Sequence, residues 1–131
     1  MYSLDLSSNT IQSIPEDYFR NLTSLVELNM LNNKLTSLPP GVFDGLSQLK
    51  ELRLEYNRIT FISPLAMNDL ISLETLWISY NSIHETFAAT LLSNSKVSQF
   101  DLSSNPLSNT LDLWSTTVGF NKLPIANMCV L

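Results

Sequence analysis

Cysteine, glycine and basic residues are all scarce in this chain of 131 residues. The only cysteine, Cys129, excludes an internal disulfide framework and a cysteine-rich zinc site. Three glycines and no low-complexity run argue against an intrinsically disordered chain. Seven Lys and Arg against twelve Asp and Glu give a net charge of −5. Scattered basic residues do not supply the clustered positive charge that nucleic acids require, so we expect no nucleic-acid partner.

Long hydrophobic segments are also missing. The longest apolar run, 87–92, is interrupted by Thr90 and is far shorter than the ~20 residues that span a bilayer. The chain does not begin with a charged segment followed by an apolar one, as a secretory signal would. We therefore expect no membrane insertion in this chain. The compartment stays open, since the chain could be cytoplasmic or a piece of a secreted protein whose signal lies outside it.

Five copies of one pattern are present, each starting 24 residues after the previous copy. The first positions are Met1, Leu25, Leu49, Leu73 and Val97. Aliphatic or aromatic residues recur at the fourth, sixth and eleventh positions, and asparagine recurs at the ninth. The pattern is L-x-x-L-x-L-x-x-N-x-L, repeated in phase. It predicts units at 1–24, 25–48, 49–72, 73–96 and, incomplete, 97–110.

The second half of the unit also repeats. Ile14-Pro15 matches Leu38-Pro39, and Phe19 matches Phe43. This pattern resembles the leucine-rich repeat family, in its typical 24-residue extracellular subtype. The segment 38–46, LPPGVFDGL, is similar to repeat modules of Toll-like receptors, Slit-type proteins and variable lymphocyte receptors. The resemblance implies extracellular or cell-surface immune recognition, as part of a longer receptor-type protein.

Alternating apolar and polar residues, as in Leu52-Arg53-Leu54, predict one strand per unit. Equivalent strands separated by a return must run parallel. We therefore predict an α/β solenoid of horseshoe shape, with a parallel β-sheet on the concave face and irregular or short-helical returns on the convex face. The asparagines should be buried and pair with turn backbone, because an amide both donates and accepts. This predicted structural ladder is Asn9, Asn33, Asn57, Asn81 and Asn105. Phe19 and Phe43 should stack as a second core spine.

The repeat weakens toward the end of the chain. The fourth unit loses its proline, and a helix over 85–92 is possible there. We expect 111–131 to form a tail that caps the last repeat. A degraded unit over 113–123 is the alternative, although a spacing of 16 residues from Val97 is short for this fold. Uncapped solenoid ends could also associate as a dimer.

The residues displayed by the concave face are the candidate binding site. Trp, Tyr and Arg dominate interface energetics, and they gather in the third and fourth units. The predicted partner-binding residues are Glu27, Leu31, Glu51, Arg53, Glu55, Tyr56, Trp77 and Tyr80. The glutamates form an acidic flank that suits a basic partner surface. Two alternatives are open: Trp77 could lie flat over Arg53 as a cation–π pair, and Glu27 with Glu51 could hold a cation.

No motif for catalysis or for a cofactor is present, and we expect neither an enzyme nor a metal site. His84, the single histidine, has no catalytic neighbours in the sequence and is interpreted as a solvated loop residue. Asn21 begins the only N-x-S/T sequon and is a possible glycosylation site. The favoured function is therefore recognition of a protein ligand. The alternatives are an intracellular scaffold or adaptor, and a truncated piece without independent function.

Overall fold

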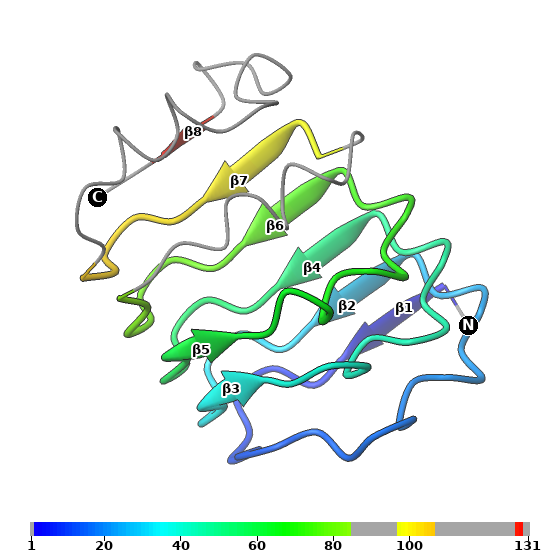
Figure 1. Ribbon diagram of the computed structural model, residues 1–131, viewed down its shortest axis with the longest axis horizontal. Helices are drawn as coiled ribbons and strands as arrows, with labels where there is room; N and C mark the ends of the chain where they lie inside the picture. Colours follow the sequence, from blue (N-terminus) through cyan, green and yellow to red (C-terminus); the bar gives the residue numbers. More distant parts are fainter. Residues whose placement is uncertain (1, 85–96, 107–127, 130–131) are drawn as a thin grey trace.

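The computed structural model describes residues 2–84, 97–106 and 128–129. One three-residue strand begins each of the five repeats: β1 (Ser3–Asp5), β2 (Glu27–Asn29), β4 (Glu51–Arg53), β6 (Thr75–Trp77) and β7 (Gln99–Asp101). With β8 (Met128–Cys129) they form a parallel six-stranded sheet in the order β1-β2-β4-β6-β7-β8 (Figure 1). Pairs such as Leu28 with Leu52 are in register across the sheet. The predicted solenoid with a parallel sheet is confirmed.

Regular hydrogen bonding between repeats continues past the assigned strands. The amide of Leu54 donates to the carbonyl of Trp77 at 2.7 Å, and that of Tyr56 donates to Ser79 at 3.2 Å. The same two bonds recur between the first and second, second and third, and fourth and fifth repeats. Each repeat is therefore held to the next through its eighth position, and side chains at equivalent positions stand in straight columns.

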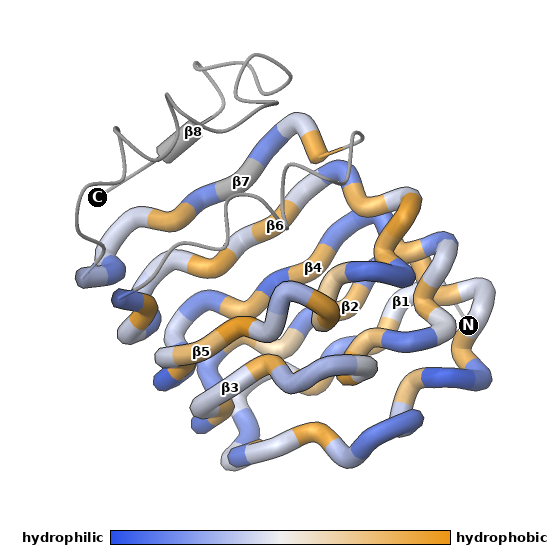
Figure 2. The backbone as a smooth tube through the Cα atoms, in the orientation of Figure 1, coloured by the Kyte–Doolittle hydropathy of each residue, from blue (hydrophilic) through white to orange (hydrophobic). Residues whose placement is uncertain are grey.

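The core lies between the main sheet and the returns. Columns of leucine and isoleucine from the first, fourth, sixth and eleventh positions fill it, and they appear in Figure 2 as hydrophobic points that recur along each coil. Phe19 and Phe43 stack with ring centroids 6.3 Å apart and an interplanar angle of 20°. The predicted second core spine is confirmed, and Met67 continues it as a buried residue.

The returns on the far side carry short strands that the sequence did not predict. β3 (Ser37–Leu38) and β5 (Phe61–Ile62) pair in parallel and form a separate two-stranded sheet (Figure 1). The rest of the described returns consists of turns and irregular chain, without a helix. The helix considered for 85–92 lies outside the described residues.

β8 lies within the predicted tail and pairs with β7, so that Asp101 is in register with Cys129. The alternative degraded unit over 113–123 lies outside the described residues. In the described part of the chain, no helix has the length and apolar character needed to cross a bilayer.

Candidate functional site

The outward positions of the main strands form the candidate site, which we call the concave face. The columns Ser3-Glu27-Glu51-Thr75-Gln99 and Asp5-Asn29-Arg53-Trp77-Asp101 run across it in register. Each of these side chains is exposed or half-buried, whereas Leu28, Leu52 and Leu76 between the two columns are buried. The structure therefore places Glu27, Glu51, Arg53 and Trp77 on one surface, as the alternation predicts.

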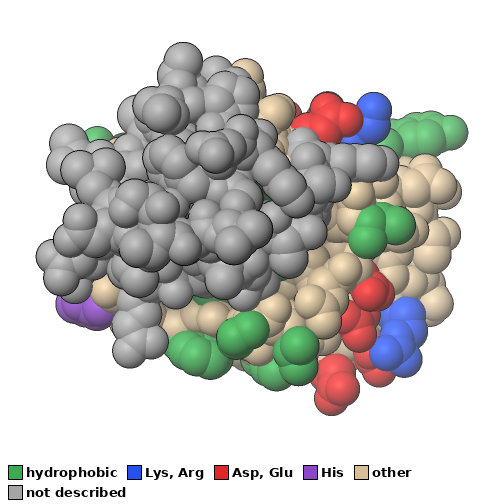
Figure 3. Space-filling model, turned by 45° about the horizontal axis from the view of Figure 1, so that its top comes forward, with side chains coloured by type: hydrophobic (Ala, Val, Ile, Leu, Met, Phe, Trp, Pro, Cys, Tyr) green, Lys and Arg blue, Asp and Glu red, His purple; other side chains and the backbone are tan. Residues whose placement is uncertain are grey.

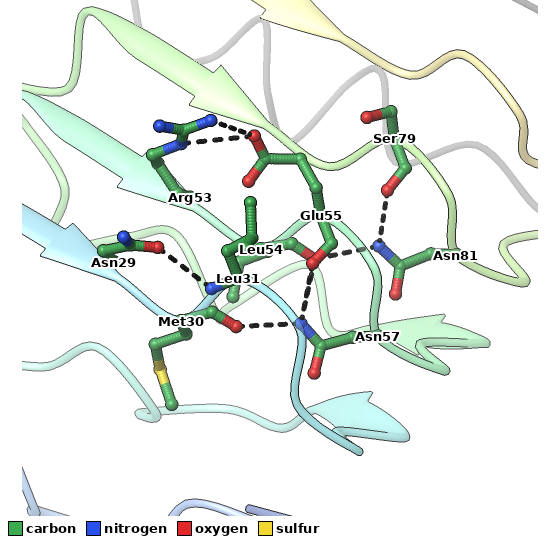
Figure 4. A network of polar contacts seen from close by, with 9 residues as sticks. All are labelled: Asn29, Met30, Leu31, Arg53, Leu54, Glu55, Asn57, Ser79 and Asn81. Atoms are coloured by element: carbon green, nitrogen blue, oxygen red, sulfur yellow. Dashed lines mark hydrogen bonds and ion pairs between the residues drawn. The ribbon is translucent and has the colours of Figure 1, made fainter. Parts of the chain in front are cut away.

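The asparagine ladder fixes the edge of this face. The amide nitrogen of Asn57 donates to the carbonyls of Met30 and Leu54, both at 3.0 Å (Figure 4). Its oxygen accepts from the amide of Leu35 at 3.0 Å. Asn33, Asn81 and Asn105 make the equivalent bonds to the preceding repeat. These four side chains are buried, as expected.

Asn9 departs from that prediction because it is exposed. Its amide bonds only to the carbonyls of Leu6 and Ser7 within its own repeat, at 3.0 and 3.1 Å. The four buried asparagines are covered by the repeat before them. The described residues include no repeat ahead of Asn9, so nothing encloses it.

The residue before each ladder asparagine has a left-handed backbone. The φ angles are 55° at Ser8, 57° at Asn32, 56° at Tyr56, 55° at Tyr80 and 55° at Ser104. Short polar residues adopt this conformation more readily than bulky ones. Repeats three and four nevertheless have tyrosine at this position, where the other repeats have serine or asparagine. Sequence reasoning did not predict this left-handed backbone.

Tyr56 and Tyr80 form an exposed aromatic stack. Their ring centroids are 4.4 Å apart and their planes differ by 7°. The two residues remain 52% and 50% exposed. Desolvation, followed by the neighbouring Tyr80, raises the pKa of Tyr56 above its usual value, so the Tyr56 ring stays neutral at physiological pH. We call these two residues the tyrosine pair.

Glu55 is not available for contact, which corrects the prediction for this residue. It reaches back to Arg53, whose Nε and Nη2 donate to its Oε1 at 3.2 and 2.9 Å (Figure 4). Its side chain is only 8% exposed, against 42% for Arg53. Glu55 Oε2 is buried and has no hydrogen-bond partner among the described residues. The hydrogen bond to Glu55 raises the pKa of Arg53, so this ion pair keeps Arg53 charged and anchored.

Trp77 lies next to Arg53 on the concave face. Arg53 and Trp77 occupy equivalent positions on β4 and β6. The guanidinium of Arg53 is nevertheless directed to Glu55 (Figure 4). Trp77 is half-buried, and so is Leu31, which lies on the same face next to Glu55 in the seventh-position column. Arg53, Trp77 and the tyrosine pair are thus the large side chains that the third and fourth repeats present on the concave face.

An acidic groove of about 210 Å³ lies at the β1 side of the face, and we keep that name for it. Its charged lining residues are Asp5, Glu27, Glu51 and Arg53. Glu27 and Glu51 are in register on neighbouring strands, and neither makes an ion pair within the described residues. The hydroxyl and amide of Ser7 hydrogen-bond to Asp5 and lower the pKa of its carboxyl below the usual value. This part of the face is therefore strongly negative.

Side chains at the fifth position of the repeat accept a hydrogen bond that sequence reasoning missed. The Oδ1 atoms of Asp5, Asn29 and Asp101 accept from the amide two residues ahead at 2.9, 3.0 and 2.8 Å. Asp and Asn before a turn often make this bond, so the residue types could have revealed it. In repeats three and four Arg53 and Trp77 take this position instead, and neither side chain has an oxygen to accept that bond.

The remaining candidates lie apart from this face. Asn21 is exposed and lies in a return. His84 is also exposed, on the return after Ile83. No three His, Cys, Asp or Glu side chains of the described ranges are grouped so that they could hold a metal ion. On the face drawn in Figure 3, the coloured Lys and Arg side chains lie beside acidic ones and form no broad basic patch.

Comparison with known proteins agrees with this geometry. The family profile described as "Leucine rich repeat" matches residues 1–59 and 47–107. None of the curated protein sequences matches the chain.

Solved structures of leucine-rich repeat proteins resemble the chain over most of its length. The leucine-rich repeat domain of APL1B superposes with a TM-score of 0.78 at 25% identity, over 82% of this chain and 33% of that one. TLR13, solved in complex with ssRNA13, superposes with a TM-score of 0.71 at 36% identity, over 79% of this chain and 15% of that one. The Drosophila Toll–Spatzle complex superposes with a TM-score of 0.81 at 26% identity, over 99% of this chain and 18% of that one. The chain thus spans a third or less of each of these structures.

Proposed function

Because this chain belongs to the leucine-rich repeat family, we propose that it binds a protein partner on its concave face, in the extracellular part of a longer receptor-type protein. The observation that carries this proposal is the exposed tyrosine pair beside Arg53 and Trp77. A solenoid of this family is a non-enzymatic scaffold, and binding is the role that its open face can perform.

The patch has the composition of a binding hot spot. Tyr, Trp and Arg contribute most to interface energies when they are rigid and become desolvated on binding. Here Arg53 is anchored by Glu55, and Tyr56 and Tyr80 support each other by stacking. Little side-chain entropy remains to be lost when a partner covers them. Leu31 extends the patch with apolar surface.

The charge of the face favours a protein over a nucleic acid. Asp5, Glu27 and Glu51 crowd one end, and the only cation in the acidic groove, Arg53, is neutralised by Glu55. A phosphate backbone would meet repulsion there and find no cluster of Lys and Arg. A protein surface with exposed basic side chains complements it.

Two observations support an extracellular, receptor-type parent. Toll and TLR13 are among the similar structures. The sequon asparagine Asn21 is exposed on a return, away from the concave face. A glycan on Asn21 would leave the concave face open.

Affinity for the partner tests the patch. The full chain, immobilised, is exposed to a panel of secreted and cell-surface proteins, and the binders are titrated against a Trp77→Ala/Tyr80→Asn variant. We expect at least a tenfold loss of affinity, since each residue is a hot-spot type. The matched control is Tyr2→Ala/Ile71→Ala, which removes one exposed aromatic and one exposed aliphatic residue outside the patch. Equal affinity of both variants for every binder would reject the patch.

Secretion from eukaryotic cells behind an added signal peptide tests whether Asn21 accepts a glycan. We expect the chain to carry an N-glycan on Asn21, seen as a mobility shift that peptide-N-glycosidase removes. Asn21→Gln should migrate at the deglycosylated position and keep its affinity for the partner. A secreted chain that is never modified would contradict this site.

A further inference from the structure

Smaller side chains flank the tyrosine pair on both sides in the eighth-position column. Neighbouring positions of the same column hold Asn32 next to Tyr56 and Ser104 next to Tyr80, and both are exposed. Equivalent residues of adjacent parallel strands lie about 4.8 Å apart, which is also close to the separation of stacked planar groups. Each ring therefore has one face covered by the other ring, and its outer face looks over a shorter side chain.

A positive charge suits the outer faces. The face of an aromatic ring is electron-rich and attracts cations. The acidic groove lies further along the same strand, where Glu51 stands beside Glu27. Like charges in register repel each other, and a bound cation would relieve that repulsion. The ring faces and the groove thus favour the same kind of ligand group.

Arginine fits the ring faces better than lysine. Its guanidinium is planar and weakly hydrated and stacks on aromatic rings, whereas a lysine ammonium is compact and strongly hydrated. A neutral aromatic group would also stack, but it would gain nothing from Glu27 and Glu51.

We propose that the partner presents an extended basic segment, with one arginine stacked on the tyrosine pair and a second basic side chain in the acidic groove. This inference rests on the proposed function and specifies its ligand chemistry. Five positions separate Glu51 from Tyr56, which corresponds to roughly 16 Å of extended chain. The two basic residues of the segment should therefore be about five positions apart.

The probe is a capped hexapeptide with arginine at its first and last positions and glycine and serine between them. Two further peptides carry lysine or citrulline at both positions, because citrulline keeps the planar shape of arginine without its charge. Binding to the full chain is followed by NMR titration. We expect the arginine peptide to bind two- to fivefold more tightly than the lysine peptide, and the citrulline peptide to bind most weakly. Equal binding of the arginine and lysine peptides would overturn the stacking, and equal binding of citrulline would overturn the charge recognition.

Variants locate the two contacts. Tyr56→Asn/Tyr80→Asn removes the rings but keeps a residue type that Asn32 already provides in the same conformation. This variant should bind the arginine peptide two- to fivefold more weakly than the unmodified chain does, whereas Tyr2→Ala should bind it equally well. Glu27→Gln/Glu51→Gln should weaken the binding of both the arginine and the lysine peptide. The loss should be larger than in the control Glu16→Gln/Glu74→Gln, which has the same net charge. Equal effects of the two glutamine variants would mean that only the overall charge of the chain is recognised, and equal effects of the two tyrosine variants would mean that the rings are not the contact; either result would overturn the proposal.

The two proposals can fail separately. If Trp77→Ala/Tyr80→Asn abolishes partner binding while the peptides bind without preference, the arginine site is wrong and the recognition face stands. If the peptides bind as expected while no protein partner depends on the patch, the proposed function is wrong.

Discussion

At the scale of single residues, each buried asparagine joins two repeats through hydrogen bonds that water cannot replace. Asn57→Ala would leave the amide of Leu35 without its partner in the core. It would also remove one of the two bonds to the carbonyl of Met30, which still accepts from Asn33. One unsatisfied buried group costs about 1–3 kcal/mol, so we expect a loss of about 2–3 kcal/mol in the free energy of unfolding. Denaturant titration measures it.

Asn9→Ala is the matched control for that variant. Asn9 is exposed and bonds only within its own repeat, so its loss should cost less than about 1 kcal/mol. If Asn9→Ala and Asn57→Ala cost the same, the bonds between repeats are not what the ladder contributes.

The tyrosine pair should contribute little to stability. A left-handed backbone costs a bulky residue about 1–2 kcal/mol, while an aromatic pair returns about 0.5–1.5 kcal/mol. Tyr56→Asn/Tyr80→Asn should therefore change the free energy of unfolding by no more than about 1 kcal/mol in either direction, as thermal melting can show. A large loss would indicate that the rings serve the fold rather than a ligand.

These residues also show what the sequence could predict. The asparagine column was predictable because an amide flanked by core leucines must satisfy backbone groups. The burial of Glu55 was not, because it depends on the side chain turning back to Arg53 between its column neighbours Leu31 and Ser79. Period-two alternation predicts on which face of the sheet a side chain lies, but not which neighbour the side chain turns toward on that face.

At the scale of elements, the turn at Gly45 limits how closely adjacent returns pack. A Cβ there would lie 2.3 Å from the carbonyl oxygen of Arg20, and φ is +87°. The amide of Gly45 also donates to Asp69 Oδ2 at 3.0 Å, which links two repeats. Gly45→Ala should therefore destabilise the chain by more than about 2 kcal/mol, as measured by denaturant titration.

Gly41→Ala separates the clash from the backbone strain. Gly41 has a φ of +75°, but the nearest atom to its added Cβ is the flexible carboxyl of Asp44 at 3.4 Å. We expect a cost of only about 1 kcal/mol, from the left-handed backbone alone. Equal losses at the two glycines would show that close packing of the returns is unimportant.

The strands of the main sheet were predictable as elements and those of the returns were not. Alternation around Leu28, Leu52 and Leu76 fixes both the register and the buried side. β3 and β5 are two residues long, too short for a periodic pattern, and they pair only because the main sheet already aligns the repeats.

At the scale of the whole molecule, size limits affinity. Five strands about 4.8 Å apart offer roughly 300 Å² of concave face, against about 800 Å² per partner in a standard interface. The five-repeat surface should therefore bind its partner weakly, on the order of micromolar. Its position in a longer protein, as in the similar structures, would supply the remaining contacts.

The β1 end of the solenoid is the second surface that a partner could use. Leu4, Leu6, Ile11 and Leu22 are only partly buried, whereas their counterparts in the second repeat, Leu28, Met30, Leu35 and Leu46, are buried. An apolar groove of about 180 Å³ opens there, lined mainly by Leu6, Ile11, Ile14, Phe19 and Met30. Of the described strands, β1 pairs with β2 alone, so its other edge can accept hydrogen bonds.

We therefore expect the chain to self-associate through this end at concentrations of tens of micromolar or above. Leu6→Lys/Ile11→Lys puts charge into the groove and should keep the chain monomeric, because association would then bury unpaired ammonium groups. Ile71→Lys, at a 61% exposed aliphatic residue on a return, should associate like the unmodified chain. Sedimentation velocity over a concentration series measures this, with melting curves to verify that each variant is folded. If Ile71→Lys blocked association equally, charge repulsion would explain the effect, and the β1 end would not be the surface that joins two copies.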